Sequence, residues 1–320
     1  MKAVYCEQLS DIDDLVVRDV DPPGPPGGGE LRVEIKARGV AFTDVLMARG
    51  EYQVKPELPF VIGGEGAGYV AEIGPGVEGF TTGQPVLTPG GCIEQVLVDA
   101  DRVTPLPEGT DLVAAASFRA NYHTAYYGLQ RGRLQPGETL LVHGAAGGVG
   151  LAAVDVGKLM GARVIATAST ADKLEVVRNM GADHCINYTD GFRDEVKALT
   201  GGRGADVIYD PVGDHVFDES MRCIAPFGRI LIVGFAGGKP GLAKTNHLLI
   251  KDAEVIGYTV GALMRHDPVW AARNNRVLVD WLAQGKIRPY VSHQLPLEKA
   301  ADALRLIINR EVIGKAVLTS

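Results

Sequence analysis

The residues best suited to bind a charged ligand form a glycine-rich turn between a strand and a helix. Residues 139–143 are apolar enough for a buried strand, and Ala145-Ala146-Gly147-Gly148-Val149-Gly150 follows. The spacing fits the dinucleotide fingerprint G-x-G-x-x-G, with Ala145 at the first glycine position. Gly147 leaves room for a pyrophosphate, Gly150 allows close helix–strand packing, and the helix start offers free N–H groups. A tight turn in another α/β protein would share these glycines, but the flanking strand and helix favour a dinucleotide site.

The end of the next strand indicates which dinucleotide binds. An acid about 20 residues after the glycines would hold the adenosine ribose hydroxyls of NAD. This strand instead ends Ala166-Thr167-Ala168-Ser169-Thr170, with Lys173 one turn later. Hydroxyl donors and a lysine suit a 2′-phosphate, although Ser169 or Thr170 could equally cap the following helix. The nearby acid, Asp172, is expected to point to solvent, so the sequence predicts NADPH.

The elements around the turn predict a central α/β domain. From about residue 122 to 261, strand-like runs alternate with helical segments, for example residues 163–167, 171–180 and 205–210. Such alternation is typical of βαβ units with a parallel sheet. After about residue 262 we expect one long helical stretch ending near Gly285, then a short strand, a second helix over residues 297–309 and a final strand over residues 315–318.

The N-terminal segment differs in composition and in residue pattern. Residues 1–121 are rich in Gly, Pro and short strand-like runs, among them 31–37, where apolar and polar residues alternate. We predict a β-rich domain from residues 1–121 and 262–320, and a Rossmann domain from residues 122–261.

Composition narrows the class of protein. The hydrophobic fraction is 46%, the charged fraction 22% and the net charge −7, and no run of Lys or Arg provides a nucleic-acid footprint. No apolar stretch is long enough to span a membrane, and the N-terminus lacks a secretory signal pattern. Four scattered cysteines favour a reduced, cytoplasmic setting.

Several further motifs resemble one known family. These are residues 39–45 (Gly-Val-Ala-Phe-Thr-Asp-Val), 63–68 (Gly-Gly-Glu-Gly-Ala-Gly), 124–127 (Thr-Ala-Tyr-Tyr), 143–150, 209–213 (Tyr-Asp-Pro-Val-Gly) and Gly314-Lys315. Over essentially its whole length the chain resembles the zinc-independent quinone oxidoreductase, or zeta-crystallin-like, branch of the medium-chain dehydrogenase/reductase superfamily. The resemblance implies an α/β fold with a GroES-like β-rich domain, a Rossmann doubly wound parallel-sheet domain, an active cleft between them, and a homodimer or tetramer.

The resemblance also implies which residues contact the cofactor. Near the nicotinamide it places Phe42, Thr43, Asp44, Thr124, Val212, Val233, Phe235, Ala236, Tyr258 and Val260. Near the phosphates and the adenosine it places Ala146, Gly147, Gly148, Val149, Ser169, Thr170, Lys173 and Tyr188, with Arg310 or Lys315 from the C-terminal segment.

Two positions where zinc-dependent relatives carry metal ligands differ here. Ala41 replaces the first Cys of those relatives, and Gly64 replaces the His of their Gly-His-Glu motif. Because a catalytic zinc needs three protein ligands, no metal site is expected. Some relatives in the zinc-independent branch carry Asn where this chain has Ala41, so a polar contact near the substrate is missing.

Without a Lewis acid, the substrate must itself be electrophilic. Quinones meet this requirement, and so do enones and enoyl thioesters, and the residues do not separate these classes. Tyr52 is the candidate to orient a carbonyl or donate a proton, and a packed loop aromatic is the alternative. A non-enzymatic dinucleotide-binding or structural protein is the third hypothesis.

Overall fold

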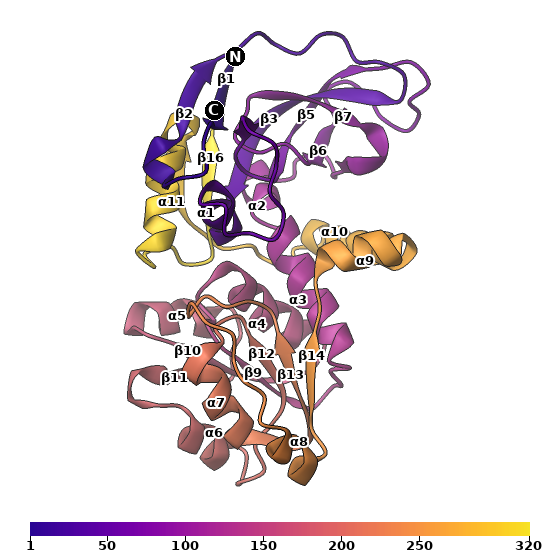
Figure 1. Ribbon diagram of the computed structural model, residues 1–320. Coiled ribbons are helices and arrows are strands. Elements are labelled where there is room, and N and C mark those ends of the chain that lie inside the picture. Colours follow the sequence, from indigo (N-terminus) through magenta and orange to yellow (C-terminus); the bar gives the residue numbers. More distant parts are fainter. The chain divides into compact units, whose positions relative to one another are not determined.

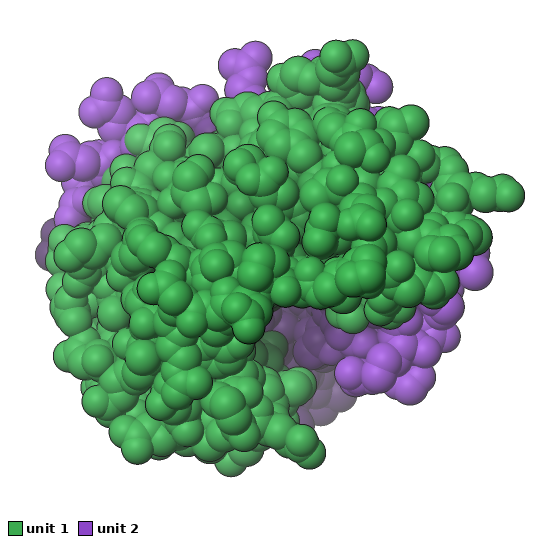
Figure 2. Space-filling view, turned by 90° about the horizontal axis from the view of Figure 1, so that it is seen from above, with its two compact units in different colours: residues 1–119, 289–320 green, residues 120–288 purple.

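The computed structural model describes residues 1–320, which form two compact units. Unit 1 comprises Met1–Arg119 and Pro289–Ser320, and unit 2 comprises Ala120–Arg288. Figure 1 shows the elements of each unit, and Figure 2 colours the two units separately. No helix of the chain is both long and apolar enough to cross a membrane.

Unit 1 is built around a long strand, β3, whose inward-facing residues alternate with outward-facing ones. β3 (Glu30–Val40) pairs with β5 (Glu65–Ile73), β7 (Gln95–Asp99) and the C-terminal β16 (Lys315–Thr319). The sheet continues through β6 (Pro85–Thr88) to β8 (Thr104–Pro105) on one side and ends at β15 (Val291–Pro296) on the other. A smaller sheet has the order β2-β1-β4, with β2 at Val16–Asp19, β1 at Lys2–Cys6 and β4 at Phe60–Val61. The helices of unit 1 are α1 (Phe42–Ala48), α2 (Leu112–Ala116) and α11 (Ala300–Ile308).

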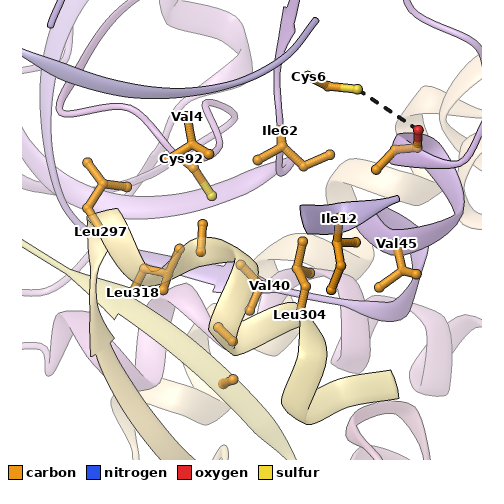
Figure 3. Packing of buried hydrophobic residues seen from close by; sticks show 14 residues of the cluster. Val4, Cys6, Ile12, Val40, Val45, Ile62, Cys92, Leu297, Leu304 and Leu318 are labelled. Carbon is orange, nitrogen blue, oxygen red and sulfur yellow. Dashed lines mark hydrogen bonds between the residues drawn. The ribbon is translucent and has the colours of Figure 1, made fainter. Parts of the chain in front are cut away.

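The two ends of the chain share one hydrophobic core in unit 1. Figure 3 shows Val4 and Cys6 of β1 packed in the same cluster as Leu304 of α11 and Leu318 of β16. All four side chains are at most 1% exposed. Removing apolar surface from water is the main favourable term in folding, so this cluster stabilises the return of residues 289–320 to the N-terminal segment.

Unit 2 contains a six-stranded parallel sheet with the order β11-β10-β9-β12-β13-β14. The strands are β9 (Thr139–Val142), β10 (Arg163–Ala168), β11 (His184–Asn187), β12 (Ala205–Asp210), β13 (Ile224–Ile232) and β14 (Glu254–Gly257). Counted along the chain this is the order 3-2-1-4-5-6 of a Rossmann domain. Ligands of such sheets bind beyond the carboxyl ends of the strands where the order reverses, here between β9 and β12.

Helices cover both faces of this sheet (Figure 1). They are α3 (Arg119–Arg131), α4 (Gly148–Leu159), α5 (Ala171–Asn179), α6 (Arg193–Leu199), α7 (Asp214–Cys223) and α8 (Thr245–Lys251). Two further helices, α9 (Val260–His266) and α10 (Pro268–Ala283), pack on α3. The long helical stretch expected after residue 262 is two helices, because Pro268 disfavours helical backbone at Asp267 and starts a new helix.

The second domain boundary differs from the prediction. Residues 262–288, which we expected to join the β-rich domain, cluster with unit 2, so the chain enters unit 1 again at Pro289. The reason is packing on α3: the Trp270 indole lies edge-on to Tyr127 at 5.2 Å and donates to the Gln130 side chain at 3.1 Å. Leu263 and Ala271 are buried against the same Tyr127.

Candidate functional site

The glycine-rich turn joins the end of β9 to the start of α4. Gly144 adopts a φ of +55°, and the Gly147 N–H donates to the Gly144 carbonyl at 2.9 Å. Gly147 is the N-cap of α4, with extended backbone and no side-chain capping bond. The first N–H groups of a helix have no partner within the helix, so this 12-residue helix presents them beyond the carboxyl end of β9.

Each glycine of the turn occupies its position for a different steric reason. A Cβ on Gly150 would lie 2.3 Å from the Gly144 carbonyl oxygen, so only glycine permits this close packing. A Cβ on Gly148 would lie 2.5 Å from Nδ2 of Asn121, which comes from α3. At the exposed Gly147 the only atom within 4 Å would be the Gly144 oxygen, at 3.3 Å. The turn therefore has an open, Cβ-free face that suits a pyrophosphate.

The loops after β12 and β13 are tied together at the same edge of the sheet. The N–H groups of Val233, Ala236 and Gly237 donate to the carbonyls of Asp210, Pro211 and Val212 at 2.9, 3.0 and 2.8 Å. These bonds bring together Val212, Val233, Phe235 and Ala236, four of the residues predicted near the nicotinamide. Phe235 is 44% exposed, which leaves its ring available to a ligand.

Asp210 is a residue of this edge that sequence reasoning missed. Its buried carboxylate accepts the N–H groups of Val212 and Gly213 at 2.8 and 2.9 Å and so fixes the turn. Burial raises the pKa of Asp210, while the two N–H donors act in the opposite direction. Its position at the end of an apolar strand, in the motif Tyr209–Gly213, was the available signal.

Tyr258 and Thr124, which were both predicted near the nicotinamide, are hydrogen-bonded to each other. The Tyr258 hydroxyl donates to the Thr124 carbonyl at 3.0 Å, and its ring lies edge-on to Tyr127. Burial raises the pKa of Tyr258. Val260 begins the next helix, α9. The Tyr258 hydroxyl is thus bonded within unit 2, and its ring is the part that remains for ligand contact.

At the end of β10, the helix-capping interpretation of Thr170 is confirmed. Thr170 is the N-cap of α5, and its hydroxyl accepts the Lys173 N–H at 3.4 Å. Asp172 is exposed, as expected. Tyr188 follows β11, which pairs with β10, so Ser169, Thr170 and Tyr188 follow the ends of neighbouring strands. A cap and an anion site use the same helix amides, so the capping role leaves this edge suited to a phosphate.

His143, next to the glycine turn, has a packing role. Its two ring nitrogens lie 3.1 Å from the Thr167 hydroxyl and 2.9 Å from the Ser220 hydroxyl, and its ring lies against Phe192. The side chain is 1% exposed, and burial lowers the pKa of His143 to about 3. A neutral imidazole with both nitrogens hydrogen-bonded anchors β9 to β10 and α7.

In unit 1, the predicted cofactor residues of α1 divide into exposed and buried ones. Phe42 and Thr43, in the first turn of α1, are exposed. Asp44 is buried and accepts the Ala41 N–H at 2.7 Å, which caps the helix. Burial raises the pKa of Asp44 to about 6; Ala41 and Lys315 lower it and Glu65 raises it further.

Lys315 is also buried, and its ammonium lies 2.5 Å from the Glu65 carboxylate. The structure therefore gives this residue a partner inside unit 1; the cofactor contact that the family resemblance implies for Arg310 or Lys315 stays a prediction. Arg310, the other candidate of this segment, is exposed and has a left-handed backbone, with φ at +60°.

Tyr52 lies in the loop after α1 and is half-buried. Its N–H donates to the Leu46 carbonyl at 3.2 Å, which fixes the start of the loop to the helix.

Ala41 and Gly64 stand where zinc-dependent relatives carry metal ligands. The side chains include no group of three or more His, Cys, Asp or Glu that could hold a metal ion. A Cβ on Gly64 would meet no atom within 4 Å, so the place of the missing histidine is open.

Two family models match the chain. A model described as "Alcohol dehydrogenase GroES-like domain" matches residues 27–108, in unit 1, and one described as "Zinc-binding dehydrogenase" matches residues 148–274, in unit 2. The fold is therefore a GroES-like domain combined with a Rossmann-type parallel sheet.

Several proteins similar to this chain have names of oxidoreductases. The chain is 38% identical to a quinone oxidoreductase-like protein 2 homolog of Nematostella vectensis, covering 100% of this chain and 89% of that protein. It is 34% identical to a 2-haloacrylate reductase of a Burkholderia species, covering 92% of each. The crystal structure of Escherichia coli quinone oxidoreductase complexed with NADPH superposes with a TM-score of 0.91 at 28% identity, over the full length of both chains.

These likenesses extend over both units and agree with the glycine turn and strand order described above. The chain therefore belongs to the quinone oxidoreductase branch of the medium-chain dehydrogenase/reductase superfamily, and it is an oxidoreductase of that superfamily.

Proposed function

We propose that this protein is an NADPH-dependent, zinc-independent reductase of quinones. The observation that carries the proposal is the combination of the open glycine turn before α4 with the acid-free end of β10. The first suits a dinucleotide pyrophosphate, and the second suits a 2′-phosphate on the adenosine ribose. The similar Escherichia coli enzyme, whose structure holds NADPH, is consistent with this assignment.

The cofactor would lie along the carboxyl edge of the sheet in unit 2. Ala146, Gly147, Gly148 and Val149 would hold the pyrophosphate at the start of α4. Ser169, Thr170, Lys173 and Tyr188 would surround the 2′-phosphate. The loops at Val212, Val233, Phe235 and Ala236, with Thr124, Tyr258 and Val260, would line the nicotinamide half. The proposed contacts from unit 1 are Phe42, Thr43, Asp44, Arg310 and Lys315, of which the first two are exposed at the start of α1.

Bound NADPH would supply a hydride, and the protein would supply orientation and exclusion of water. Because Ala41 and Gly64 cannot ligate a metal, the acceptor must be electrophilic without a Lewis acid, as quinones are. The Phe235 ring is an exposed apolar surface against which a flat acceptor could pack. Tyr52 is the proposed hydroxyl for orienting the acceptor carbonyl.

Reduction of a carbon–carbon double bond conjugated to a carbonyl is the second candidate function. The observation in its favour is the similarity to a 2-haloacrylate reductase, a relative named for an unsaturated acid. The chemical requirement is the same, since an enone or enoyl thioester also accepts hydride without a metal.

A substrate panel tests the proposal. Initial rates with NADPH would be compared for a naphthoquinone, phenanthrenequinone, a short enone, 2-chloroacrylate and an enoyl-CoA. We expect the highest kcat/KM with a quinone. Turnover restricted to the enone, acrylate or thioester would assign the second function instead, and NADPH binding without turnover of any of them would contradict both.

Cofactor choice is tested with a charge reversal on α5. Lys173→Glu places a carboxylate where the 2′-phosphate is expected, and Arg178→Glu makes the same change at an exposed position near the end of the helix. We expect the first variant to lose kcat/KM with NADPH by about tenfold or more, while the NADH value stays within about twofold. A wild-type preference for NADH, or equal effects of the two variants, would exclude the assignment of the phosphate site.

We also propose a homodimer or tetramer. β14 is the last strand of the sheet, so one of its edges is unpaired. Leu249 on the preceding helix is 80% exposed. An unpaired strand edge beside an exposed apolar side chain is a typical contact surface. Light scattering of the purified protein would show the mass, and a monomer at micromolar concentration would contradict the proposal.

A further inference from the structure

A pocket on unit 2 lies away from the glycine turn and is lined mainly by cationic side chains. It has a volume of about 290 Å³ and is formed by α6, α7 and α8. Its cationic residues are Arg193 and Lys197 of α6, Arg222 of α7 and Lys251 of α8, and His247 lies among them. Such a concentration of positive charge is unexpected on a chain whose net charge is −7.

The pocket lies at the opposite end of the sheet from the proposed cofactor site. α7 ends at Cys223 directly before β13 begins, and α8 ends at Lys251 shortly before β14 begins. The last residues of both helices therefore lie near the amino ends of the strands. The glycine turn follows the carboxyl end of β9. Figure 1 shows α6 and α8 at the lower end of unit 2.

The acids near the pocket neutralise only part of its charge. Asp194 lies 2.9 Å from Arg193, and Glu219 lies 3.6 Å from Arg193 and 3.8 Å from Arg222. Neither Lys197 nor Lys251 forms an ion pair with any acid of the chain. Four cationic side chains thus face two carboxylates, which leaves an excess of two positive charges.

The two lysines repel each other. The Lys251 ammonium donates to the Ile224 carbonyl, which holds it at the pocket. Burial lowers the pKa of Lys251, and the charge of Lys197 lowers it further. An anion between these ammonium groups would relieve the repulsion and add charge-assisted hydrogen bonds, which are the strongest hydrogen bonds proteins make.

One wall of the pocket is apolar. Met221 and Ile250 line it, and Met221 is 2% exposed whereas Ile250 is 78% exposed. We propose that this pocket binds a phosphate monoester, with the dianionic phosphate between Lys197, Lys251 and Arg222 and the organic group against Met221 and Ile250. The charge of the ligand matches the excess charge of the pocket.

Calorimetric titration with phenyl phosphate tests the proposal. The titration uses the full chain with NADP⁺ in excess, because the start of α4 also suits a phosphate. We expect one equivalent to bind, and inorganic phosphate to bind more weakly because it lacks the apolar contact. Lys197→Met should weaken binding by at least about tenfold, while Lys197→Arg should retain it.

The matched control is Lys244→Met. Lys244 lies just before α8 and pairs with Asp218 at 3.9 Å, and it is not part of the pocket. This variant loses the same charge and should bind as the wild type does. Equal weakening by the two methionine variants would overturn the proposal, as would the absence of phenyl phosphate binding by the wild type. Inorganic phosphate binding as tightly as phenyl phosphate would overturn the assignment of the apolar wall.

Two further measurements separate loss of ligand binding from loss of folding and test whether binding depends on charge. Thermal unfolding verifies that the variants are folded, and raising the salt concentration should weaken wild-type binding, because screening reduces charge interactions. Salt-independent binding would also contradict the proposal. Since the readout is heat of binding and does not involve hydride transfer, its failure is distinguishable from a failure of the proposed function.

Discussion

The ammonium of Lys315 lies 2.5 Å from the carboxylate of Glu65, and the two side chains are only 4% and 9% exposed. The residues belong to β16 and β5, which flank β3 on its two sides. Gly39 of β3 lies between them: a Cβ there would lie 2.7 Å from Glu65 Oε1 and 2.9 Å from Lys315 Cε. The pair therefore joins the C-terminal strand to the N-terminal domain across a glycine.

Removing the lysine of this pair should strongly destabilise the protein. Lys315→Met removes the cation of a buried ion pair, and breaking such a pair costs about 3–5 kcal/mol. The double variant Glu65→Gln/Lys315→Met should recover most of that loss, because neither charge then remains. Urea unfolding of both single variants and the double variant measures the coupling. Additive effects would show that the two side chains do not interact.

The stability of the protein should depend on pH through Asp44. Its folded-state pKa is raised to about 6 from 3.8, mainly by burial. The native state favours the protonated form of Asp44, and this preference adds to the free energy of unfolding. The added stability is fully present below pH 3.8 and is lost as the pH rises through 6. Relative to Asp44→Asn, the wild type should lose up to about 3 kcal/mol between about pH 4 and pH 7.

The control for Asp44 is Asp101→Asn, at an exposed position. Unfolding free energies of the three proteins would be compared across this pH range. A wild-type value that runs parallel to that of Asp44→Asn would show that Asp44 titrates alike in the folded and unfolded states.

His143 should give a pH dependence of the opposite sign. Burial lowers its folded-state pKa to about 3 from 6.5, so the neutral ring stabilises the native state above pH 6.5. This contribution is lost as the pH falls below 6.5, at about 1.4 kcal/mol per pH unit until the pH approaches the folded pKa. The difference in unfolding free energy between the wild type and His143→Gln should shrink accordingly between about pH 7 and pH 5. His215→Gln, whose parent side chain is 76% exposed, serves as the control, and a constant difference for His143→Gln would refute the assignment.

Two substitutions in the glycine turn should separate folding from cofactor binding. Gly150→Ala places a Cβ 2.3 Å from the Gly144 oxygen, so we expect a loss of about 1–3 kcal/mol of stability from overpacking. Gly147→Ala meets only one atom, at 3.3 Å, so its stability should stay within about 0.5 kcal/mol.

The Cβ of Gly147→Ala would nevertheless occupy the open face proposed for the pyrophosphate. We expect the Kd for NADPH to rise about tenfold, equivalent to about 1.4 kcal/mol. Denaturant unfolding and fluorescence titration with NADPH measure the two quantities. Unchanged NADPH affinity in Gly147→Ala would exclude the proposed position of the pyrophosphate.

The sequence by itself determined the features that depend on neighbouring residues. The spacing of Gly147 and Gly150 predicted the turn, and apolar runs such as residues 139–142 and 205–210 predicted the parallel strands, because strand and helix periodicity are local properties. The break at Pro268 also has a local cause, since proline restricts the residue before it, but the helical pattern predicted one long helix there.

Tertiary structure decided the features that depend on residues far apart in the chain. Asn121 lies against Gly148, Lys315 pairs with Glu65, and α10 packs on α3 by way of Trp270 and Tyr127. The same holds for His143, whose neutral state results from burial between Thr167 and Ser220. Residue type and spacing identify which groups can ionise or bind, but burial and partners determine what they do, and both arise only when distant segments fold together.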